Sequence, residues 1–213
     1  MKQFILSILK ALALQVLARH QPRIVAVTGT VGKSTTAHFL YDALAMMYGA
    51  DKIGVSKHNY NGEYGVPLTI LQCVSPHSNP FLWAAVFARG LWLAFGARSY
   101  PEYLVLEYGI DHPGEMDFLL SIAAPDIGII QAISRNHIAN FASYDEYVDE
   151  KLKFVAASKS LIYNGDDSKI RRFLEENPRE KIVSFGRKSV EALDYKAVGV
   201  TSTLEGLVFT VET

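Results

Sequence analysis

Several features that would place a protein in a special class are missing from this sequence of 213 residues. Its single cysteine, Cys73, excludes an internal disulfide and a cysteine-based zinc site, and predicts a reducing, cytoplasmic location. The 21 Lys and Arg residues nearly balance the 22 Asp and Glu residues, and no basic cluster occurs, so we expect no nucleic-acid partner. The content of 49% hydrophobic and 20% charged residues excludes a disordered, collagen-like or coiled-coil protein.

Long uncharged apolar runs are also lacking, although two stretches come close. Residues 1–19 are interrupted by Lys10 and residues 81–96 by Arg89, so neither is expected to cross a bilayer. The first stretch has apolar residues at helical spacing: Phe4, Ile5, Ile8, Leu9 and Leu12. We expect a helix packed on the domain, and leave open an apolar patch that contacts a membrane surface or a neighbouring domain.

The rest of the chain alternates between strand and helix patterns. Apolar runs that predict strands lie at 23–28, 52–56, 103–107, 127–133, 161–163 and 181–185, and helix patterns at 34–48, 145–158 and 168–176. In the first helix the apolar side is expected to hold Phe39, Leu40, Leu44 and Met47. Runs that are apolar on both faces are typical of a parallel sheet covered by helices.

The last segment, with β patterns at 195–200 and 207–211, lacks an intervening helix. The sequence therefore predicts an α/β fold with a mostly parallel, doubly wound sheet and a small β-rich extension at the C-terminus. We expect two parts, an N-terminal apolar helix at 1–22 and a domain at 23–213.

A glycine-rich loop follows the first strand. Its candidate phosphate-binding residues are Thr28, Gly29, Thr30, Val31, Gly32, Lys33, Ser34 and Thr35. Such a turn before a helix directs backbone N–H groups and the helix dipole at an anion, while Lys33 can reach the β- and γ-phosphates and Ser34 can ligate Mg²⁺. The common phosphate loop has glycine where Val27 stands here, so this loop is the shorter G-x-x-G-K-S. The alternative is a tight turn with a surface lysine.

The loop resembles the T-G-T-x-G-K-[ST] motif of the Mur ligase family, ATP-dependent amide ligases of peptidoglycan precursor synthesis. Further segments from about Ile24 to Gly186 resemble the family in the same order. They are N-G-E-Y-G-V-P-L at 61–68, L-E-Y-G at 106–109, P-G-E at 113–115, P-D-I-G-I-I at 125–130, His137, F-A-S at 141–143, E-K at 150–151 and N-G-D-D at 164–167. The resemblance is closest to the branch that joins D-Ala-D-Ala to UDP-MurNAc-tripeptide.

This resemblance implies ATP and Mg²⁺ as cofactors and a role for each matching residue. Glu107 is implied as a Mg²⁺ ligand, which suits a carboxylate at the carboxyl end of a buried strand. His137 is implied as the ligand of a second Mg²⁺. Lys33, Lys151 and His137 are implied as catalytic residues, with Lys151 carbamylated by CO₂. Asn61 is implied to lie near substrate. Residue type alone leaves simpler roles open for these four residues. Glu107 could cap a helix, His137 could be structural, Lys151 could be a surface lysine and Asn61 could be a turn residue.

The implied reaction is activation of the UDP-MurNAc-peptide carboxylate as an acyl phosphate, followed by attack of the D-Ala-D-Ala amine. The alternatives are a Mur-type ligase with another amino substrate and a non-catalytic nucleotide-binding module. The chain departs from the family at Ala132, where many members have Asn, and at Ala142, where they have Gly. Family members also carry further domains and an H-N-x-x-N segment, so we expect a domain that is incomplete at its C-terminal end, binds ATP weakly and does not complete ligation alone.

Overall fold

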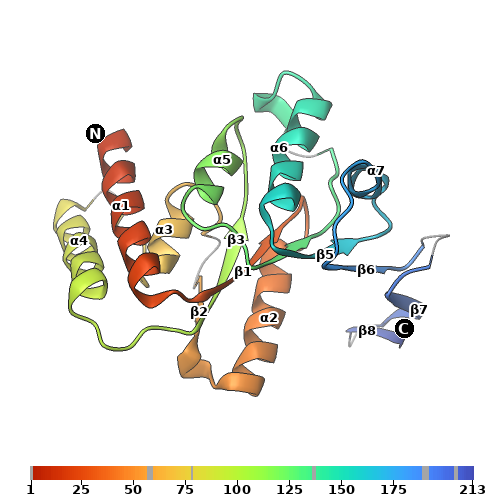
Figure 1. The fold of residues 1–213 in the computed structure, drawn as a ribbon, viewed down its shortest axis with the longest axis horizontal. Coiled ribbons are helices and arrows are strands. Elements are labelled where there is room, and N and C mark those ends of the chain that lie inside the picture. The colour runs from red at the N-terminus through yellow and green to blue at the C-terminus, as the bar shows by residue number, and fades with distance from the viewer. Residues whose placement is uncertain (1, 57–59, 78, 136–137, 189–191, 204–205) are drawn as a thin grey trace.

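The computed structural model describes residues 2–56, 60–77, 79–135, 138–188, 192–203 and 206–213. Within these residues a single sheet has the strand order β2-β3-β1-β4-β5-β6-β7-β8 (Figure 1). The strands are β1 (Arg23–Thr28), β2 (Ile53–Val55), β3 (Tyr103–Tyr108), β4 (Ile127–Ile130), β5 (Ser160–Asn164), β6 (Ile182–Gly186), β7 (Tyr195–Thr203) and β8 (Gly206–Glu212). All neighbouring strands pair in parallel except β7 and β8, which confirms the predicted mostly parallel sheet with a β-rich extension.

Helices cover both faces of this sheet. They are α1 (Lys2–His20), α2 (Lys33–Tyr48), α3 (Gly65–Ile70), α4 (Pro80–Phe95), α5 (Glu115–Leu120), α6 (Tyr144–Ala157) and α7 (Ser168–Glu176), with 3₁₀ turns η1 (Ala50–Lys52) and η2 (Ile138–Asn140). Figure 1 shows α2 on one side of the central strands and α1, α3, α5 and α6 on the other. The short helices α3 and α5 were not predicted from the sequence. None of the helices in the described ranges is long and apolar enough to cross a membrane.

The alternation of side chains along β1 explains the two layers. Val25 and Val27 pack against Leu40 and Leu44 of α2, whereas Ile24 joins the larger core on the opposite face. Because successive side chains of a strand point to opposite faces, an unbroken apolar strand needs helices on both sides. The observed layers therefore follow directly from the sequence of this strand.

Two of the predicted helix faces were partly wrong. On α2 the buried side is centred on Ala37 and Leu44, so Phe39 and Met47 remain 70% and 69% exposed. On α1 the buried residues are Leu6, Leu9, Leu12, Ala13 and Val16, and Phe4 is 70% exposed. A short helix contacts its sheet along a narrower stripe than its apolar residues cover, and periodicity does not decide which of them lie within it.

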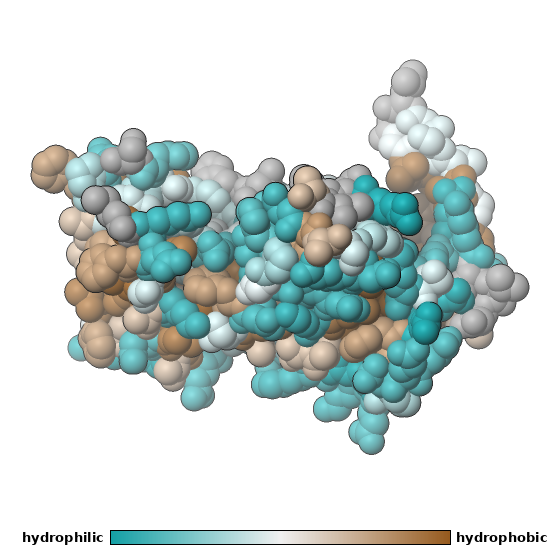
Figure 2. Space-filling view, turned by 90° about the horizontal axis from the view of Figure 1, so that it is seen from above, coloured by the Kyte–Doolittle hydropathy of each residue, from teal (hydrophilic) through white to brown (hydrophobic). Residues whose placement is uncertain are grey.

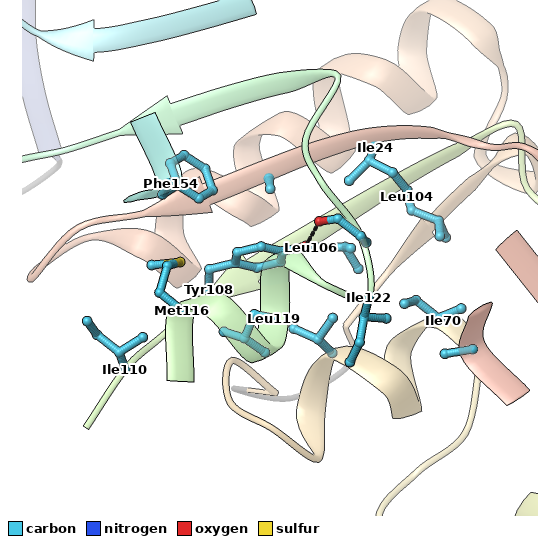
Figure 3. Packing of buried hydrophobic residues seen from close by; sticks show 14 of the residues in the cluster. Ile24, Ile70, Leu104, Leu106, Tyr108, Ile110, Met116, Leu119, Ile122 and Phe154 are labelled. Atoms are coloured by element: carbon cyan, nitrogen blue, oxygen red, sulfur yellow. Dashed lines mark hydrogen bonds between the residues drawn. The ribbon is translucent and has the colours of Figure 1, made fainter. Parts of the chain in front are cut away.

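The end of β3 is fixed in the main core (Figure 3). The buried hydroxyl of Tyr108 donates a hydrogen bond to the Ala123 carbonyl, and the ring meets that of Phe154 edge-on at 5.6 Å. Burial raises the pKa of Tyr108 above its ordinary value, so the phenol stays a neutral donor. This packing holds the preceding residue, Glu107, in a defined place.

The strand order makes β1 the topological switch point of the sheet. β3 lies on one side of β1 and β4 on the other, so the chain crosses from one side to the other between them. In open α/β sheets, ligands bind outside the carboxyl ends of the strands at such a point. The loops that follow β1, β3 and β4 are therefore the expected place for a site.

Candidate functional site

The glycine-rich loop lies between β1 and α2. Gly29 and Gly32 have φ angles of +137° and +84°, a region of backbone conformation that favours glycine. Gly32 is the N-cap of α2, and within the described residues no side chain caps this end. The free N–H groups and the positive end of the α2 dipole are therefore directed at the space above the loop, as an anion site requires.

Hydrogen bonds to the neighbouring strands hold this loop in place. Buried Thr28 donates its hydroxyl to the Tyr108 carbonyl at the end of β3 (2.8 Å). The Thr30 amide donates to the Ala132 carbonyl after β4 (2.9 Å), and the Thr30 hydroxyl accepts from the Ser134 amide (2.9 Å). The loop is thus bonded to both strands that flank β1. Val31 contributes no packing, since it is 66% exposed, and Thr35 is exposed as well.

Gln131, the residue after β4, supports the loop from below. A side chain placed at Gly29 or Gly32 would come within 2.8 Å of Gln131 atoms, so the loop rests directly on this residue. The Gln131 Nε2 group donates to the Thr36 hydroxyl, while its Oε1 atom is buried without a hydrogen-bond partner among the described residues. Sequence reasoning missed Gln131, because a glutamine after a strand carries no signal of its own.

Two lysines meet at the loop. Lys33 Nζ donates to the Gly29 carbonyl at 3.1 Å, and Lys151 Nζ, from the middle of α6, donates to the same oxygen at 3.3 Å. Lys151 is almost fully buried, with 1% of its surface exposed. Burial, together with repulsion from Lys33, lowers the pKa of Lys151 to about 7, although Asp111 acts in the opposite direction. The amine is therefore partly neutral near pH 7.

Tyr147 completes this environment and was also missed. Its hydroxyl lies 3.2 Å from the Thr30 hydroxyl, and its ring centroid lies 5.1 Å from Lys151 Nζ. The two residues stand four positions apart on α6, a spacing that places side chains on one helix face. That spacing could have identified Tyr147 once Lys151 was chosen.

Glu107 and Asn61 lie together at the same edge of the sheet. Glu107 is buried, with 5% exposed, and is in register with Val27 one residue before Thr28. Asn61 Nδ2 donates to Glu107 Oε1 at 3.1 Å, and the Gly109 amide donates to the Asn61 carbonyl at 2.6 Å. A cavity of about 270 Å³ opens here, lined by Tyr60, Asn61, Gly62, Glu63, Tyr64, Gly65, Gly109, Asp111 and Glu115.

The neighbouring carboxylates have structural partners. Glu150 accepts from the Met116 amide (2.9 Å) and from Lys153 (2.7 Å), and thereby joins α5 to α6. Asp167 caps α7 and accepts from the Ile133 amide at 2.7 Å, which ties the chain after β4 to α7. The sequence predicted that Asp167 lies in a turn, but it did not predict the hydrogen bond to the Ile133 amide.

The oxygen donors at this edge are of the kind that Mg²⁺ prefers, namely the Ser34 hydroxyl and the Glu107 carboxylate. His137, the other predicted metal ligand, lies outside the described residues. Among the residues that are described, there is no group of three or more His, Cys, Asp or Glu side chains that could hold a metal ion.

The fold and the loop together define an α/β domain of the phosphate-loop class. The chain belongs to the Mur ligase middle domain family, whose sequence model matches residues 27–82 and 90–213.

Two curated relatives of the chain share one name. It is 28% identical over 210 residues to the UDP-N-acetylmuramoyl-tripeptide–D-alanyl-D-alanine ligase of Bacillus subtilis, a match that covers 97% of this chain and 39% of the relative. The ligase of the same name from Borreliella burgdorferi is 28% identical over 186 residues, covering 85% of this chain and 34% of the relative. The chain thus spans less than two fifths of the length of these two relatives.

Solved structures show the same fold. MurF from Acinetobacter baumannii superposes with a TM-score of 0.73 at 22% identity, covering 98% of this chain and 40% of that one. MurF ligase from Thermotoga maritima, solved in complex with ADP, has a TM-score of 0.73 at 23% identity, covering 98% and 42%.

Proposed function

We propose that this chain is the nucleotide-binding part of an ATP-dependent ligase that joins D-Ala-D-Ala to UDP-MurNAc-tripeptide. The observation that carries the proposal is the convergence of the open α2 N-terminus, Lys33, Lys151 and Glu107 at the carboxyl edge around β1. The name shared by the curated relatives supports the choice of substrates. A cytoplasmic location follows from this proposal, because ATP and the nucleotide-linked precursor are cytoplasmic molecules.

The proposed reaction has two steps. The terminal carboxylate of the tripeptide attacks the γ-phosphorus of ATP, and the bond to the β-γ bridging oxygen breaks, giving an acyl phosphate and ADP. The amine of D-Ala-D-Ala then attacks the acyl carbon and loses a proton, and the tetrahedral intermediate expels phosphate to leave the amide. The protein's contribution is to position the reactants and to stabilise negative charge.

The residues of the loop bind and orient the phosphates. The N–H groups from Val31 to Ser34 face the β- and γ-phosphates, and Lys33 leaves the Gly29 carbonyl to donate to a phosphate oxygen. Thr28 and Thr30 keep the loop in register with β3 and β4 through their hydroxyl groups. Val31 and Thr35 contribute their backbone groups.

One Mg²⁺ would be held by the Ser34 hydroxyl and the Glu107 carboxylate, and a second Mg²⁺ by His137. When bound, Mg²⁺ neutralises phosphate charge and fixes the orientation of the triphosphate. Asn61 keeps the Glu107 carboxylate pointing toward this space through its 3.1 Å hydrogen bond. The same amide borders the cavity beside Glu115, so we place the peptide substrate there.

Lys151 is proposed to react with CO₂. Its neutral Nζ atom forms a bond to the carbon of CO₂ and releases one proton, which converts a buried amine into a carbamate anion. A pKa of about 7 supports this step, because a lysine with its ordinary pKa would carry almost no neutral amine at neutral pH. The carbamate would turn a cation beside Lys33 into its ion-pair partner and supply an oxygen toward the phosphate site.

Nucleotide binding by the 213-residue chain tests the first half of the proposal. Equilibrium titration with a fluorescent ATP analogue should show binding that Lys33→Met weakens at least tenfold. Lys52→Met is the matched control, because Lys52 is half-exposed and pairs with Glu102 on the surface (2.9 Å). Equal affinities of the two variants would contradict the assignment of the loop.

Turnover by the complete gene product tests the second half. Phosphate release that requires both UDP-MurNAc-tripeptide and D-Ala-D-Ala, with the matching amide detected by mass spectrometry, supports the proposed ligase. Release that requires a different amino substrate identifies another Mur-type ligase. Nucleotide binding without release under any combination identifies a non-catalytic module.

A further inference from the structure

The outward side of α4 is apolar along its whole length. Its exposed residues recur at helical spacing, and none of them is polar except through the Trp92 ring nitrogen. From the second residue of the helix onward they are Phe81, Leu82, Ala84, Ala85, Ala88, Leu91, Trp92 and Phe95, here called the α4 stripe. Phe81 and Phe95 are 84% and 65% exposed. A surface helix ordinarily turns polar residues toward water, so this stripe marks a contact surface.

The helix that carries this stripe is firmly attached. Asn79 caps its first turn by accepting from two backbone amides, and Pro80 occupies the first position. At the other end the Arg19 guanidinium from α1 donates to the carbonyls of Ala94, Phe95 and Ala97. The stripe is therefore the surface of an ordered helix.

Close packing against α1 leaves the stripe facing outward. A side chain at Gly90 would come within 2.9 Å of Leu12, so the two helices touch through the face opposite the stripe. Figure 1 shows α1 and α4 side by side at one end of the molecule, and Figure 2 shows hydrophobic residues gathered at that end. The family match is interrupted at residues 83–89, inside α4, so the middle of the stripe, at Ala84, Ala85 and Ala88, lies outside the matched residues.

The charged side chains of α1 and α4 are all basic. α1 carries Lys2, Lys10 and Arg19, α4 carries Arg89, and neither helix contains an Asp or Glu residue. The chain as a whole has a net charge of −1, so the remainder is acidic. The Arg89 guanidinium lies 4.5 Å from the Trp92 ring centroid, and exposed Arg98 follows the helix. Basic side chains thus stand at the border of the apolar stripe.

These features fit one occupant better than the others. A protein partner could cover the apolar residues, but it would have to supply carboxylates of its own to pair with Arg89 and Arg98. A second copy of the chain would bring the same basic side chains and no carboxylate from α1 or α4 to pair with them. An anionic lipid surface supplies a fluid apolar layer and negative headgroups, and aromatic side chains such as Trp92 favour that boundary.

We propose that the α4 stripe binds the surface of an anionic lipid bilayer, with the helix lying parallel to the membrane plane and Arg89 and Arg98 at the headgroups. The site is peripheral, since α4 is too short to span a bilayer. This binding is independent of the ligase chemistry proposed above. Its consequence is to hold the chain beside the membrane while the phosphate loop remains in water.

Vesicle flotation of the 213-residue chain tests the proposal. Binding is expected to phosphatidylcholine vesicles that contain one quarter phosphatidylglycerol, with much weaker binding to phosphatidylcholine alone. The variant Phe81→Gln/Trp92→Gln/Phe95→Gln should weaken binding at least tenfold, because each buried aromatic contributes substantially. Phe39→Gln/Met46→Gln/Met47→Gln on α2 is the matched control, since these large apolar residues are also mostly exposed and lie outside the stripe.

Two further measurements separate the parts of the proposal. Arg89→Gln and Arg98→Gln should each weaken binding roughly fivefold at low salt and less at high salt. In a Trp83→Phe background Trp92 is the sole tryptophan, and its fluorescence should shift to shorter wavelength with anionic vesicles. Circular dichroism and thermal unfolding confirm that each variant is folded.

Several outcomes would overturn the proposal. No binding to anionic vesicles, or equal loss in the α2 control, rejects the stripe as a lipid site. Equal binding to neutral and anionic vesicles rejects the role of charge. A dimer that depends on the stripe, seen by sedimentation without vesicle binding, identifies a second copy as the occupant.

Discussion

Lys33 and Lys151 donate to one backbone oxygen, that of Gly29, at 3.1 and 3.3 Å. The two side chains come from α2 and α6, far apart in the sequence, and their charges repel each other. A buried ammonium beside a second, half-buried one is unfavourable unless one of them is neutral or an anion binds between them. The two lysine side chains therefore favour the binding of an anion between them. Under the proposed function this anion is the phosphate of ATP, the Lys151 carbamate, or both.

Replacing Lys151 by Met should stabilise the folded chain. At pH 6 the ammonium is protonated in both the folded and the unfolded chain, so the full cost of its burial opposes folding. Met has a similar volume and no charge, and we expect the free energy of unfolding to rise by about 2 kcal/mol. Urea unfolding at pH 6 in degassed buffer, without CO₂, measures this.

The gain should fall as the pH rises. Above a pKa of about 7 the folded chain releases the Lys151 proton, whereas the unfolded chain keeps it up to about pH 10.5, so wild-type stability increases relative to the variant. Lys153→Met is the control on the same helix. Lys153 pairs with exposed Asp117 (2.6 Å) and with buried Glu150 (2.7 Å), so its loss should destabilise the folded chain at pH 6, the opposite sign to Lys151→Met. A gain for Lys151→Met that does not change between pH 6 and 9 would contradict the depressed pKa.

In β1 and α2 the sequence predicted the elements correctly but not how they pack. A β-branched apolar run, a glycine-rich turn and an amphipathic helix are local signals, and all three are present where expected. Phe39 and Met47 were placed wrongly because the contact stripe of α2 depends on how the helix sits on the sheet. That orientation is set by packing partners distant in sequence, such as Val105 of β3.

The site shows the same limit. The motif order brought Lys33, Glu107, Asn61 and Lys151 into consideration, and the structure places them along one edge. Gln131 could not be found, since its importance arises from the close approach of the loop to its side chain. For His137 the sequence expectation stays a prediction, as that residue is outside the described ranges.

Gly32→Ala and Gly114→Ala form a matched pair. Both glycines are helix N-caps with φ of +84°, so alanine costs about 1 kcal/mol of conformational energy at either position. At Gly114 nothing lies within 4 Å of the added methyl group, whereas at Gly32 it meets Gln131 Oε1 at 2.8 Å. We expect thermal unfolding to show the greater loss for Gly32→Ala. Titration with ATP should show a reduced affinity for Gly32→Ala and an unchanged affinity for Gly114→Ala. Similar effects of the two substitutions on ATP affinity would contradict the loop geometry.

Gln131 supports the loop by filling the space beneath it. The effect of a substitution at Gln131 on ATP affinity should therefore depend on the volume of the new side chain. Gln131→Ala leaves a gap beneath Gly29 and Gly32, and we expect ATP affinity to fall roughly fivefold as the loop loses its rigid support. Gln131→Met keeps the volume and removes the unpartnered Oε1 atom, so affinity should be largely retained. If Gln131→Met were as weak as Gln131→Ala, the Nε2 bond to Thr36 would be the essential contact instead.

Glu107→Gln should separate the contribution of Mg²⁺ from that of the loop. The variant keeps an oxygen that can accept from Asn61 Nδ2, so the end of β3 should remain intact, with unfolding changed by less than about 1 kcal/mol. The wild-type chain is expected to bind ATP more tightly with Mg²⁺ than with EDTA, because the buried carboxylate holds the cation against the phosphates. In Glu107→Gln most of that difference should disappear, while binding in EDTA is unchanged or improved by the lost negative charge.

Glu102→Gln is the control, because Glu102 is a surface carboxylate paired with Lys52, and this variant should keep the full Mg²⁺ dependence. Isothermal titration of all three proteins in Mg²⁺ and in EDTA makes the comparison. An undiminished Mg²⁺ effect in Glu107→Gln would remove this carboxylate from the proposed metal site.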